Sequence, residues 1–203
     1  MFQNDSWSDP DGTLHGCLGQ FKKLKDAGKK FDLKMAIGGW SWSGNFSNAF
    51  LTVRDRESMV QSIVDLLKKY PIFNGVIIDW EYLSNNGINY GLGGNIARAV
   101  DQTNFVSFLT LLRQKISNTT SVAMCVSADP AAAAFDTMLL EPLIDEFHVM
   151  TYDFHSSSWG ETVTCHQTNA RKSSFGKFSC EESADYFISR GIPPNKLLVG
   201  VAY

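Results

Sequence analysis

Two carboxylates at the end of an apolar segment are the residues of this sequence best placed for acid–base chemistry. Gly75 opens a short run of β-branched residues that ends in Asp79, Trp80 and Glu81. Such a run predicts a strand buried on both faces, and a buried strand carries charge only where solvent or a functional site compensates it. Because side chains alternate along a strand, Ile77, Asp79 and Glu81 should share one face. The pair indicates acid–base chemistry, and the alternative is a strand-end pair bridged to Lys or Arg.

The composition indicates one globular domain with balanced charge. The chain has 203 residues, of which 44% are hydrophobic, enough to bury one sizeable core. Its 18 Lys and Arg residues face 21 Asp and Glu residues, a formal net charge of −3, so neither nucleic acid nor a membrane is an expected partner. No apolar run approaches the roughly 18 residues of a membrane helix. Residues 1–6 lack the basic and apolar regions of a signal peptide.

The cysteines and histidines predict neither a disulfide scaffold nor a metal or other cofactor. Cys17 falls on the apolar face of a predicted helix and Cys125 inside a predicted strand, so both are interpreted as core residues. Cys165 and Cys180 bracket a loop, and whether they pair is open. His148 lies on the inward face of a predicted strand and is interpreted as a hydrogen-bonded residue rather than a catalyst.

Apolar spacing alternates along the chain between the periods of a helix and of a strand. Helical spacing recurs near residues 14–28, 55–70, 101–112, 131–143 and 181–190, and Asp101 is a predicted N-cap. Besides the strand that ends in Asp79, strands are predicted over residues 31–37, 121–126, 147–152 and 197–202. Alternation of this kind predicts parallel strands joined by crossover helices.

Chemically functional residues follow the predicted strands at their C-terminal ends. A doubly wound sheet and a (β/α)8 barrel both fit the alternation, but a doubly wound nucleotide-binding sheet gathers such residues at one switch point. Polar and aromatic residues after every strand are typical of a barrel mouth. Here they are Gly39, Trp40, Asp79, Glu81, Asp129, Tyr152, Asp153 and Tyr203. The alternation is therefore interpreted as part of a TIM (β/α)8 barrel of the α/β class.

Three segments in register resemble motifs of the glycoside hydrolases of family 18, the chitinases. Residues 36–40, AIGGW, resemble the SxGG motif of the third barrel strand with its trailing Trp. Residues 74–81, NGVIIDWE, resemble the DxxDxDxE motif of the fourth strand, and residues 150–153, MTYD, match the MxYD motif of the sixth. Residues 200–203 are similar to the start of the seventh-strand segment. The segments keep the family's order and spacing over nearly the whole chain, which makes a chance similarity improbable.

The resemblance implies that this sequence is an internal piece of a longer hydrolase. Barrel strands three to seven map onto it, whereas strands one, two and eight would lie outside it. Residues 1–203 would then form an incomplete family 18 catalytic domain. A barrel with open edges leaves backbone groups unpaired. The resemblance also implies that the parent protein is secreted or extracellular.

The family's known chemistry implies a role for each site residue. Glu81 would protonate the leaving oxygen, Asp79 would orient the acetamido group of the substrate, and Tyr152 would hold the acetamido oxygen in line. This substrate-assisted retaining mechanism is a recognised exception to the scheme with two opposed carboxylates. The implied substrate is chitin or chito-oligosaccharides, cut by an endo-acting enzyme that needs no cofactor. Substrate contacts are expected from Gly39, Trp40, Tyr82, Met150, Asp153, Trp159 and Tyr203.

Three positions depart from the family's motifs. Asn74 and Ile77 replace two aspartates of the fourth-strand motif, and Ala36 replaces the serine of the third-strand motif. Ile77 removes a carboxylate that would share a proton with Asp79, and an apolar neighbour disfavours the charged form of Asp79. Weakened hydrolysis is therefore expected. Two alternatives stay open: a chitin-binding lectin on the same barrel, and a purely structural fragment without activity.

Overall fold

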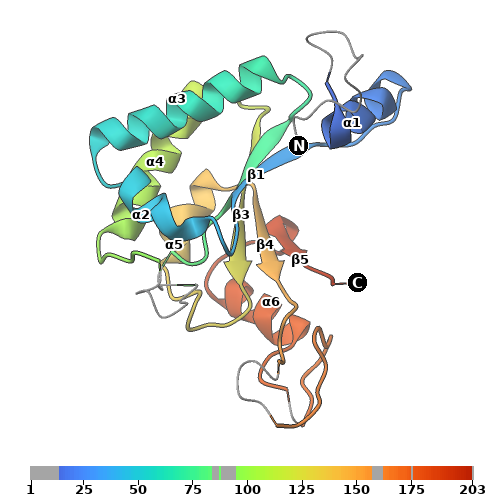
Figure 1. Cartoon of the computed structure of the whole chain (residues 1–203). Coiled ribbons are helices and arrows are strands. Elements are labelled where there is room, and N and C mark those ends of the chain that lie inside the picture. Colours follow the sequence, from blue (N-terminus) through green and yellow to red (C-terminus); the bar gives the residue numbers. More distant parts are fainter. Residues whose placement is uncertain (1–13, 84–86, 88–94, 157–161, 175, 203) are drawn as a thin grey trace.

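The computed structural model describes residues 14–83, 87, 95–156, 162–174 and 176–202 (Figure 1). Trp159 and Tyr203, both expected to contact substrate, lie outside the described residues. All five strands predicted from the sequence fall within them, and each is present with shifted boundaries.

Five strands form one parallel sheet. They are β1 (Lys34–Gly38), β2 (Gly75–Asp79), β3 (Ser121–Ser127), β4 (Glu146–Met150) and β5 (Leu197–Val199). Hydrogen-bonded neighbours follow the chain order, β1-β2-β3-β4-β5, and every pair is parallel. A doubly wound sheet reverses its strand order at a switch point, whereas sequential parallel strands joined by helices build a barrel. The sheet confirms the α/β prediction and has the strand order of an arc of a (β/α)8 barrel.

Helices connect successive strands, and one further helix precedes the first strand. The longer ones are α1 (Gly16–Asp26), α3 (Val53–Lys69), α4 (Asp101–Lys115) and α6 (Cys180–Ser189). Shorter helical turns are η1 (Ser43–Asn45), α2 (Phe46–Ala49), α5 (Thr137–Leu140), η2 (Glu141–Leu143) and η4 (Pro194–Lys196). In Figure 1, α3 and α4 lie on the same side of the sheet, and the two helices are in contact with each other.

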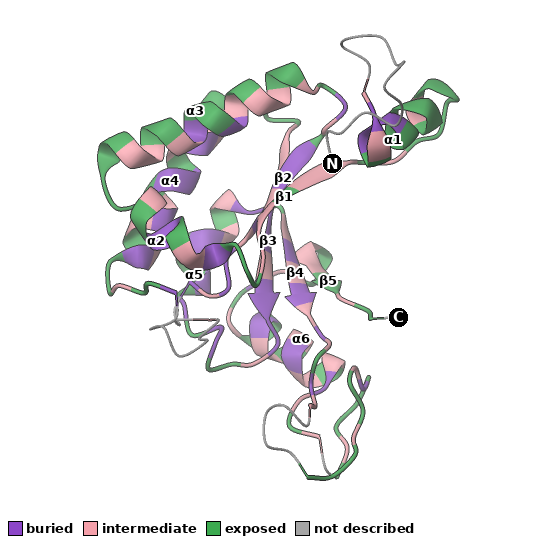
Figure 2. Cartoon of the chain, viewed as in Figure 1, coloured by how far each residue is buried: buried purple, intermediate pink, exposed green. Residues whose placement is uncertain are grey.

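The face of the sheet that meets the helices is most deeply buried in its middle strands, β2, β3 and β4 (Figure 2). Val76 and Ile78 of β2, with Trp80 just beyond it, have almost no exposed surface. Trp80 packs against the rings of Phe46 and Phe105, with ring centroids 5.4 and 5.7 Å away. Each buried large apolar side chain stabilises the fold by about 1.5–3 kcal/mol. This apolar cluster therefore anchors the strand that carries both acids.

The opposite face of the sheet, which we call the inner face, carries both polar and apolar side chains. Its residues are alternate members of each strand, and most are half-exposed: Ala36, Ile77, Asp79, Cys125, Ser127, His148 and Met150. Ile77 and Asp79 share this face, as the period-two alternation predicts. Burial of the two faces thus differs in the way expected for the outer and inner sides of a barrel sheet.

The helix predicted over residues 131–143 forms only in its second half. Asp129 Oδ1 accepts a hydrogen bond from the N–H of Ala131 at 2.8 Å, which closes a turn where the helix should start. α5 begins only at Thr137, after an extended Asp136 whose carboxylate caps the helix. The prediction is wrong for the first half because an Asx turn competes with helix formation.

Asp101 is the first residue of α4, so its prediction as the N-cap is wrong; the N-cap is Val100. The Asp101 carboxylate is buried, and it accepts hydrogen bonds from the Ser47 hydroxyl at 2.6 Å and the Arg98 N–H at 2.7 Å. The carboxylate oxygen that would have capped α4 thus accepts a hydrogen bond from Ser47 of α2 instead. The residue ties the start of α4 to α2, the short helix that follows β1.

The four cysteines are all free thiols. Cys17 is exposed on α1, so its interpretation as a core residue is wrong; Leu18 takes the buried position instead. Cys125 lies in β3 as predicted and is half-buried. Cys165 and Cys180, whose pairing the sequence leaves open, are not bridged.

Candidate active site

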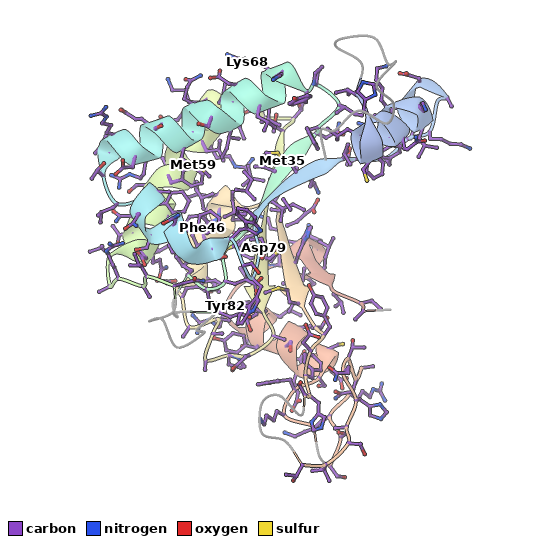
Figure 3. All side chains as sticks on the ribbon, viewed as in Figure 1. Met35, Phe46, Met59, Lys68, Asp79 and Tyr82 are labelled. Atoms are coloured by element: carbon purple, nitrogen blue, oxygen red, sulfur yellow. The ribbon has the colours of Figure 1, made fainter. Side chains whose placement is uncertain are left out.

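Asp79 is the last residue of β2 (Figure 3), and Glu81 follows it two positions later. The end of β1 lies close by, since Gly38 pairs in register with Asp79. The N–H of Gly39 donates to the backbone oxygen of Asp79 at 2.8 Å. A Cβ atom at Gly38 would lie 2.1 Å from the same oxygen, and Gly38 has a φ of +109°. Both facts require glycine at this position. The glycine pair therefore brings Trp40 to the same end of the sheet as the acids.

Ser43 and Asn95 hold the backbone around the acids, and the sequence analysis identified neither. The buried Ser43 hydroxyl lies 3.1 Å from the carbonyl oxygen of Asp79 and accepts a hydrogen bond from the N–H of Glu81 at 2.9 Å. The Asn95 side chain donates to the carbonyl oxygen of Glu81 at 3.0 Å. Their only signal in the sequence is a polar residue near the glycine pair and another in a Gly- and Asn-rich loop.

Glu81 has the surroundings of a general acid. It is only 8% exposed. Burial, followed by the negative charge of Asp79, raises the pKa of Glu81 to about 7. A hydrogen bond from the Tyr82 hydroxyl opposes this rise, and the charge of Asp153 adds to it. A carboxylic acid that is half-protonated near pH 7 can donate a proton at physiological pH.

Asp79 has a different environment, although burial raises its pKa as well. A hydrogen bond from the Cys125 thiol and the charge of His148 both act to lower the pKa of Asp79. Its Oδ1 atom is buried and has no hydrogen-bond partner in the part of the chain that the structure describes. Two neighbours of Asp79 thus favour its ionised form, and its Oδ1 atom can accept a hydrogen bond from a bound molecule.

Tyr152 faces the acid pair from the end of β4. Its ring lies against Gly200, where a Cβ atom would sit 2.7 Å from the ring atom Cε1. Burial raises the pKa of Tyr152, and so do the nearby groups that become negative on ionisation, Cys125, Asp79 and Glu81, in that order. A tyrosine with a raised pKa keeps its hydroxyl proton and acts as a hydrogen-bond donor. The structure thus brings the three predicted catalytic residues to one end of the sheet.

Met150 and Asp153 flank Tyr152, as their positions in the MTYD segment require. Met150 is the last residue of β4 and pairs in register with Ser127 on the inner face. Asp153 is exposed and has a positive φ of 56°, a conformation that aspartate adopts more readily than most residues. Among the predicted substrate contacts, Trp159 and Tyr203 lie outside the described residues.

Aromatic side chains line the surface beside the acids. The rings of Trp40 and Tyr82 meet edge to face, with centroids 6.3 Å apart and an interplanar angle of 61°. Trp40 is 46% exposed and Trp42 is 82% exposed. Exposed indole rings are unusual, and they offer flat apolar faces on which sugar rings can stack. Figure 3 shows Tyr82 beyond Asp79, at the end of the sheet where the strands finish.

Asn74, the first departure from the family's motif, has a structural role away from the acids. It precedes the first residue of β2, five positions before Asp79, or about 16 Å at the rise of a strand. Its side-chain oxygen accepts hydrogen bonds from Lys25 Nζ at 2.8 Å and from the N–H of Leu33 at 3.1 Å. Asparagine at this position connects the start of β2 to the segment before β1.

His148 makes the hydrogen bond predicted for it. Its Nε2 atom lies 2.8 Å from Oε2 of Glu146, and the other oxygen of Glu146 forms an ion pair with Lys34 of β1. Burial raises the pKa of Glu146, but the hydrogen bonds and charges of Lys34 and His148 outweigh burial, so the net shift is downward. This polar chain crosses the inner face from β1 to β4.

Two kinds of feature are absent from the described residues. No group of three or more His, Cys, Asp or Glu side chains in that part of the chain is arranged to hold a metal ion. None of its helices is long and apolar enough to cross a membrane.

Comparisons with known proteins agree with this geometry. The model of the family "Glycosyl hydrolases family 18" matches residues 1–203. The chain is 30% identical to Chitinase A1 of Niallia circulans over 219 aligned residues, which cover 100% of this chain and 30% of that protein. It is 31% identical to Chitinase 1 of Yersinia entomophaga, with 92% of this chain and 34% of that protein covered.

A solved structure extends the likeness to the fold. The catalytic domain of the psychrophilic chitinase B from Arthrobacter TAD20 matches with a TM-score of 0.79 at 29% identity, covering 95% of this chain and 51% of that chain. The chain thus spans about half of that domain and a smaller share of the two relatives above. With a family match over its whole length and the strand order of a partial TIM barrel, the chain belongs to the glycosyl hydrolases of family 18.

Proposed function

We propose that the protein containing this chain hydrolyses β-1,4-linked N-acetylglucosamine polymers by a substrate-assisted retaining mechanism. The observation that carries the proposal is the state of Glu81: a buried carboxyl group with a pKa of about 7, beside Asp79 at the C-terminal end of a barrel strand. Relatives named as chitinases support the choice of substrate. Chitin is an extracellular polymer, so secretion belongs to the same proposal. Endo action stays a prediction.

The placement of the acids favours substrate assistance. A retaining glycosidase with two catalytic carboxylates needs them about 5–5.5 Å apart on opposite sides of the scissile bond. Asp79 and Glu81 come from one strand and lie two residues apart, so they approach a bound sugar from the same side. That leaves the far side of the anomeric carbon without a protein nucleophile. The acetamido oxygen of an N-acetylated sugar can take that place.

In the first step, Glu81 gives its proton to the glycosidic oxygen while the bond from that oxygen to the anomeric carbon breaks. The acetamido oxygen bonds to the same carbon, and a cyclic oxazolinium ion forms. Asp79 accepts a hydrogen bond from the acetamido N–H and stabilises the positive charge, using an oxygen such as the unpartnered Oδ1. The Tyr152 hydroxyl, kept protonated by its surroundings, orients the acetamido oxygen.

In the second step, water attacks the anomeric carbon and Glu81 takes back a proton. The oxazolinium ring opens, and the configuration of the product is the same as that of the substrate. Glu81 therefore serves first as an acid and then as a base, which a pKa near 7 permits. Trp40 and Tyr82 would hold the sugar rings by stacking.

Replacement of the acid tests the proposal. In the full-length protein, Glu81→Gln should reduce kcat on a chromogenic chitobioside by about 10²–10⁴-fold, the usual contribution of a general acid. Binding of chito-oligosaccharides should change little, because binding depends mostly on stacking while proton donation acts in the transition state. Hydrolysis at a near-parental rate by the variant would show that Glu81 is not the acid.

Thermal melts at several pH values give an independent check on Glu81. Its folded pKa of about 7 lies above the ordinary value of 4.5, so ionisation of Glu81 destabilises the folded state. The folded state is therefore most stable while Glu81 is protonated. This contribution to stability is fully present below pH 4.5 and is lost as the pH rises through 7. Glu81→Gln should therefore have a higher Tm than the parent above pH 7, and the difference should vanish below pH 4.5. In the parent, kcat/KM should also fall above about pH 7.

A chitin-binding lectin on the same barrel is the second candidate. Ile77 favours it, because Ile77 replaces the motif's aspartate and its register partners on β1 and β3, Ala36 and Ala123, carry no carboxylate. A lectin would bind chito-oligosaccharides without releasing products, and Glu81→Gln would then alter nothing that an assay of hydrolysis detects. Product analysis after long incubation separates the two candidates.

A further inference from the structure

The row of residues beside Ile77 leaves Asp79 without the hydrogen-bond donor that the family's motif would provide. Ala36, Ile77 and Ala123 are neighbours in register across β1, β2 and β3. None of these side chains has a hydrogen to donate. On β4 the same row continues to Glu146, whose carboxylate already binds Lys34 and His148. Asp79 itself lies in the next row of side chains, and that row holds the candidate donor.

In that next row, Cys125 is the residue of β3 that lies directly beside Asp79. Ile78 pairs with Met124, so the following residues, Asp79 and Cys125, are adjacent on β2 and β3 and face the same side. This register places the thiol beside the Asp79 carboxylate, and each of the two groups acts on the pKa of the other. The same row continues to His148, the register partner of Cys125 on β4.

Charges from several elements surround this pair. His148 lies on the β4 side, where Glu146 binds it, and Lys34 of β1 holds Glu146 in turn. The negative charges nearby are those of Glu81, on the far side of Asp79, and Asp153 after β4. The hydroxyl groups of Tyr82 and Tyr152 complete the set of titratable groups. Among the described residues, Cys125 thus lies between the Asp79 carboxylate and the His148 side chain, which is the basic group on this side of the site.

We propose that Cys125 is a positioning residue, whose thiol donates a hydrogen bond that orients the Asp79 carboxylate in place of the carboxyl group lost at Ile77. The inference rests on the proposed function. The thiol acts as a donor and not as a nucleophile, because burial and the charge of Asp79 raise the pKa of Cys125 to about 12. A thiol is a weak hydrogen-bond donor, so the Cys125 thiol holds the Asp79 carboxylate less firmly than a carboxyl group at position 77 would.

The contact itself can be tested without any assay of hydrolysis. In the full-length protein, the rate of alkylation of Cys125 by iodoacetamide at pH 8 is measured by peptide-resolved mass spectrometry. Asp79→Asn should increase this rate several-fold, because it removes the negative charge that holds the proton on the sulfur. The exposed Cys17 is the internal control and should react at the parental rate. An unchanged rate at Cys125 would overturn the proposed contact.

The positioning role is tested by Cys125→Ala and Cys125→Ser. Cys125→Ala should move the acid limb of the kcat/KM profile on chito-oligosaccharides upward by about one pH unit, since the charged form of Asp79 loses a hydrogen bond. Cys125→Ser keeps a donor and should restore the parental limb. Identical profiles for the parent and both variants would overturn the role. A parent without hydrolysis would refute the proposed function, and with it the role, while the alkylation rates still decide whether the contact exists.

Discussion

Single residues give the two carboxylates of the site different surroundings. Burial and the neighbouring charge of Asp79 raise the pKa of Glu81 to about 7. Burial raises the pKa of Asp79 too, and the Cys125 thiol and the charge of His148 reduce this rise without cancelling it. Two carboxyl groups with unlike surroundings are typical of glycosidases, where one acts as the acid and the other stabilises charge.

Restoring the missing carboxylate should strengthen the reaction. Ile77→Asp places a second carboxyl group two residues before Asp79 on the same face of β2, where the two groups would share a proton. Two carboxylates in contact titrate as a coupled pair. We expect kcat to rise several-fold and the acid limb of the pH profile to shift by about one unit.

Ile77→Asn is the matched control for that variant, since it is polar and of similar size to Asp but cannot share a proton. It should leave the acid limb where it is in the parent. If Ile77→Asp changes neither the rate nor the profile, the surroundings of Asp79 already supply what the family's second aspartate would.

The alternation of side chains made the shared face of Ile77 and Asp79 predictable from the sequence. Ser43 and Asn95 were not predictable as partners of the acids, because contacts with residues 38 and 14 positions away in the chain arise only from tertiary packing. Asn74 shows the converse: the motif marked it as a departure, yet its hydrogen bonds to Lys25 and Leu33 belong to the start of the strand.

At the scale of elements, the close approach of β1 and β2 at Gly38 determines where the acids lie. A Cβ atom there would meet the backbone oxygen of Asp79 at 2.1 Å and the Phe46 ring at 2.6 Å. Gly38→Ala should therefore push the two strand ends apart, lower the Tm of the full-length protein and abolish hydrolysis. Thermal melts and initial rates measure both effects.

Gly28→Ala is the control for Gly38→Ala. Gly28 also has a positive φ, of +78°, but a Cβ atom there would meet nothing within 4 Å. The backbone strain of alanine at a positive φ, about 1–2 kcal/mol, is common to both variants. The fall in Tm should be at least twice as large for Gly38→Ala. Equal falls would mean that the contact between β1 and β2 is not essential.

The order and type of the main elements were predictable because their apolar periods are clear, and α3, α4 and all five strands confirm this. The failures lie where a polar side chain had two competing partners. The Asp129 turn replaces the start of a predicted helix, and the Asp101 carboxylate binds Ser47 and Arg98 instead of capping α4. Propensity alone does not decide between such local and tertiary partners.

At the scale of the whole molecule, the sheet has two edges within the described residues. β1 pairs only with β2, and β5 pairs only with β4. Val199 and Val201, at and beyond the end of β5, are 49% and 61% exposed. Exposed apolar edge strands promote association. Residues 1–203 expressed alone should therefore be oligomeric, aggregated or molten, and inactive on chito-oligosaccharides, as light scattering and a thermal melt would show.

Charge on that edge provides the control. The same chain with Val199→Lys and Val201→Lys should associate less, because lysine on an edge strand opposes pairing with another chain. A monodisperse, unmodified chain with a sharp cooperative unfolding transition would contradict the interpretation of the sheet as part of a larger barrel.

The most direct test of the proposed chemistry is the anomeric configuration of the first product. Proton NMR of a chito-oligosaccharide digest by the full-length protein, recorded within the first minutes, distinguishes the β-anomer from the α-anomer before mutarotation mixes them. Glu81 acting with the substrate's own acetamido group predicts that the β-anomer appears first, and that Glu81→Gln abolishes the signal. Initial release of the α-anomer, or release of the β-anomer at the parental rate by Glu81→Gln, would contradict it.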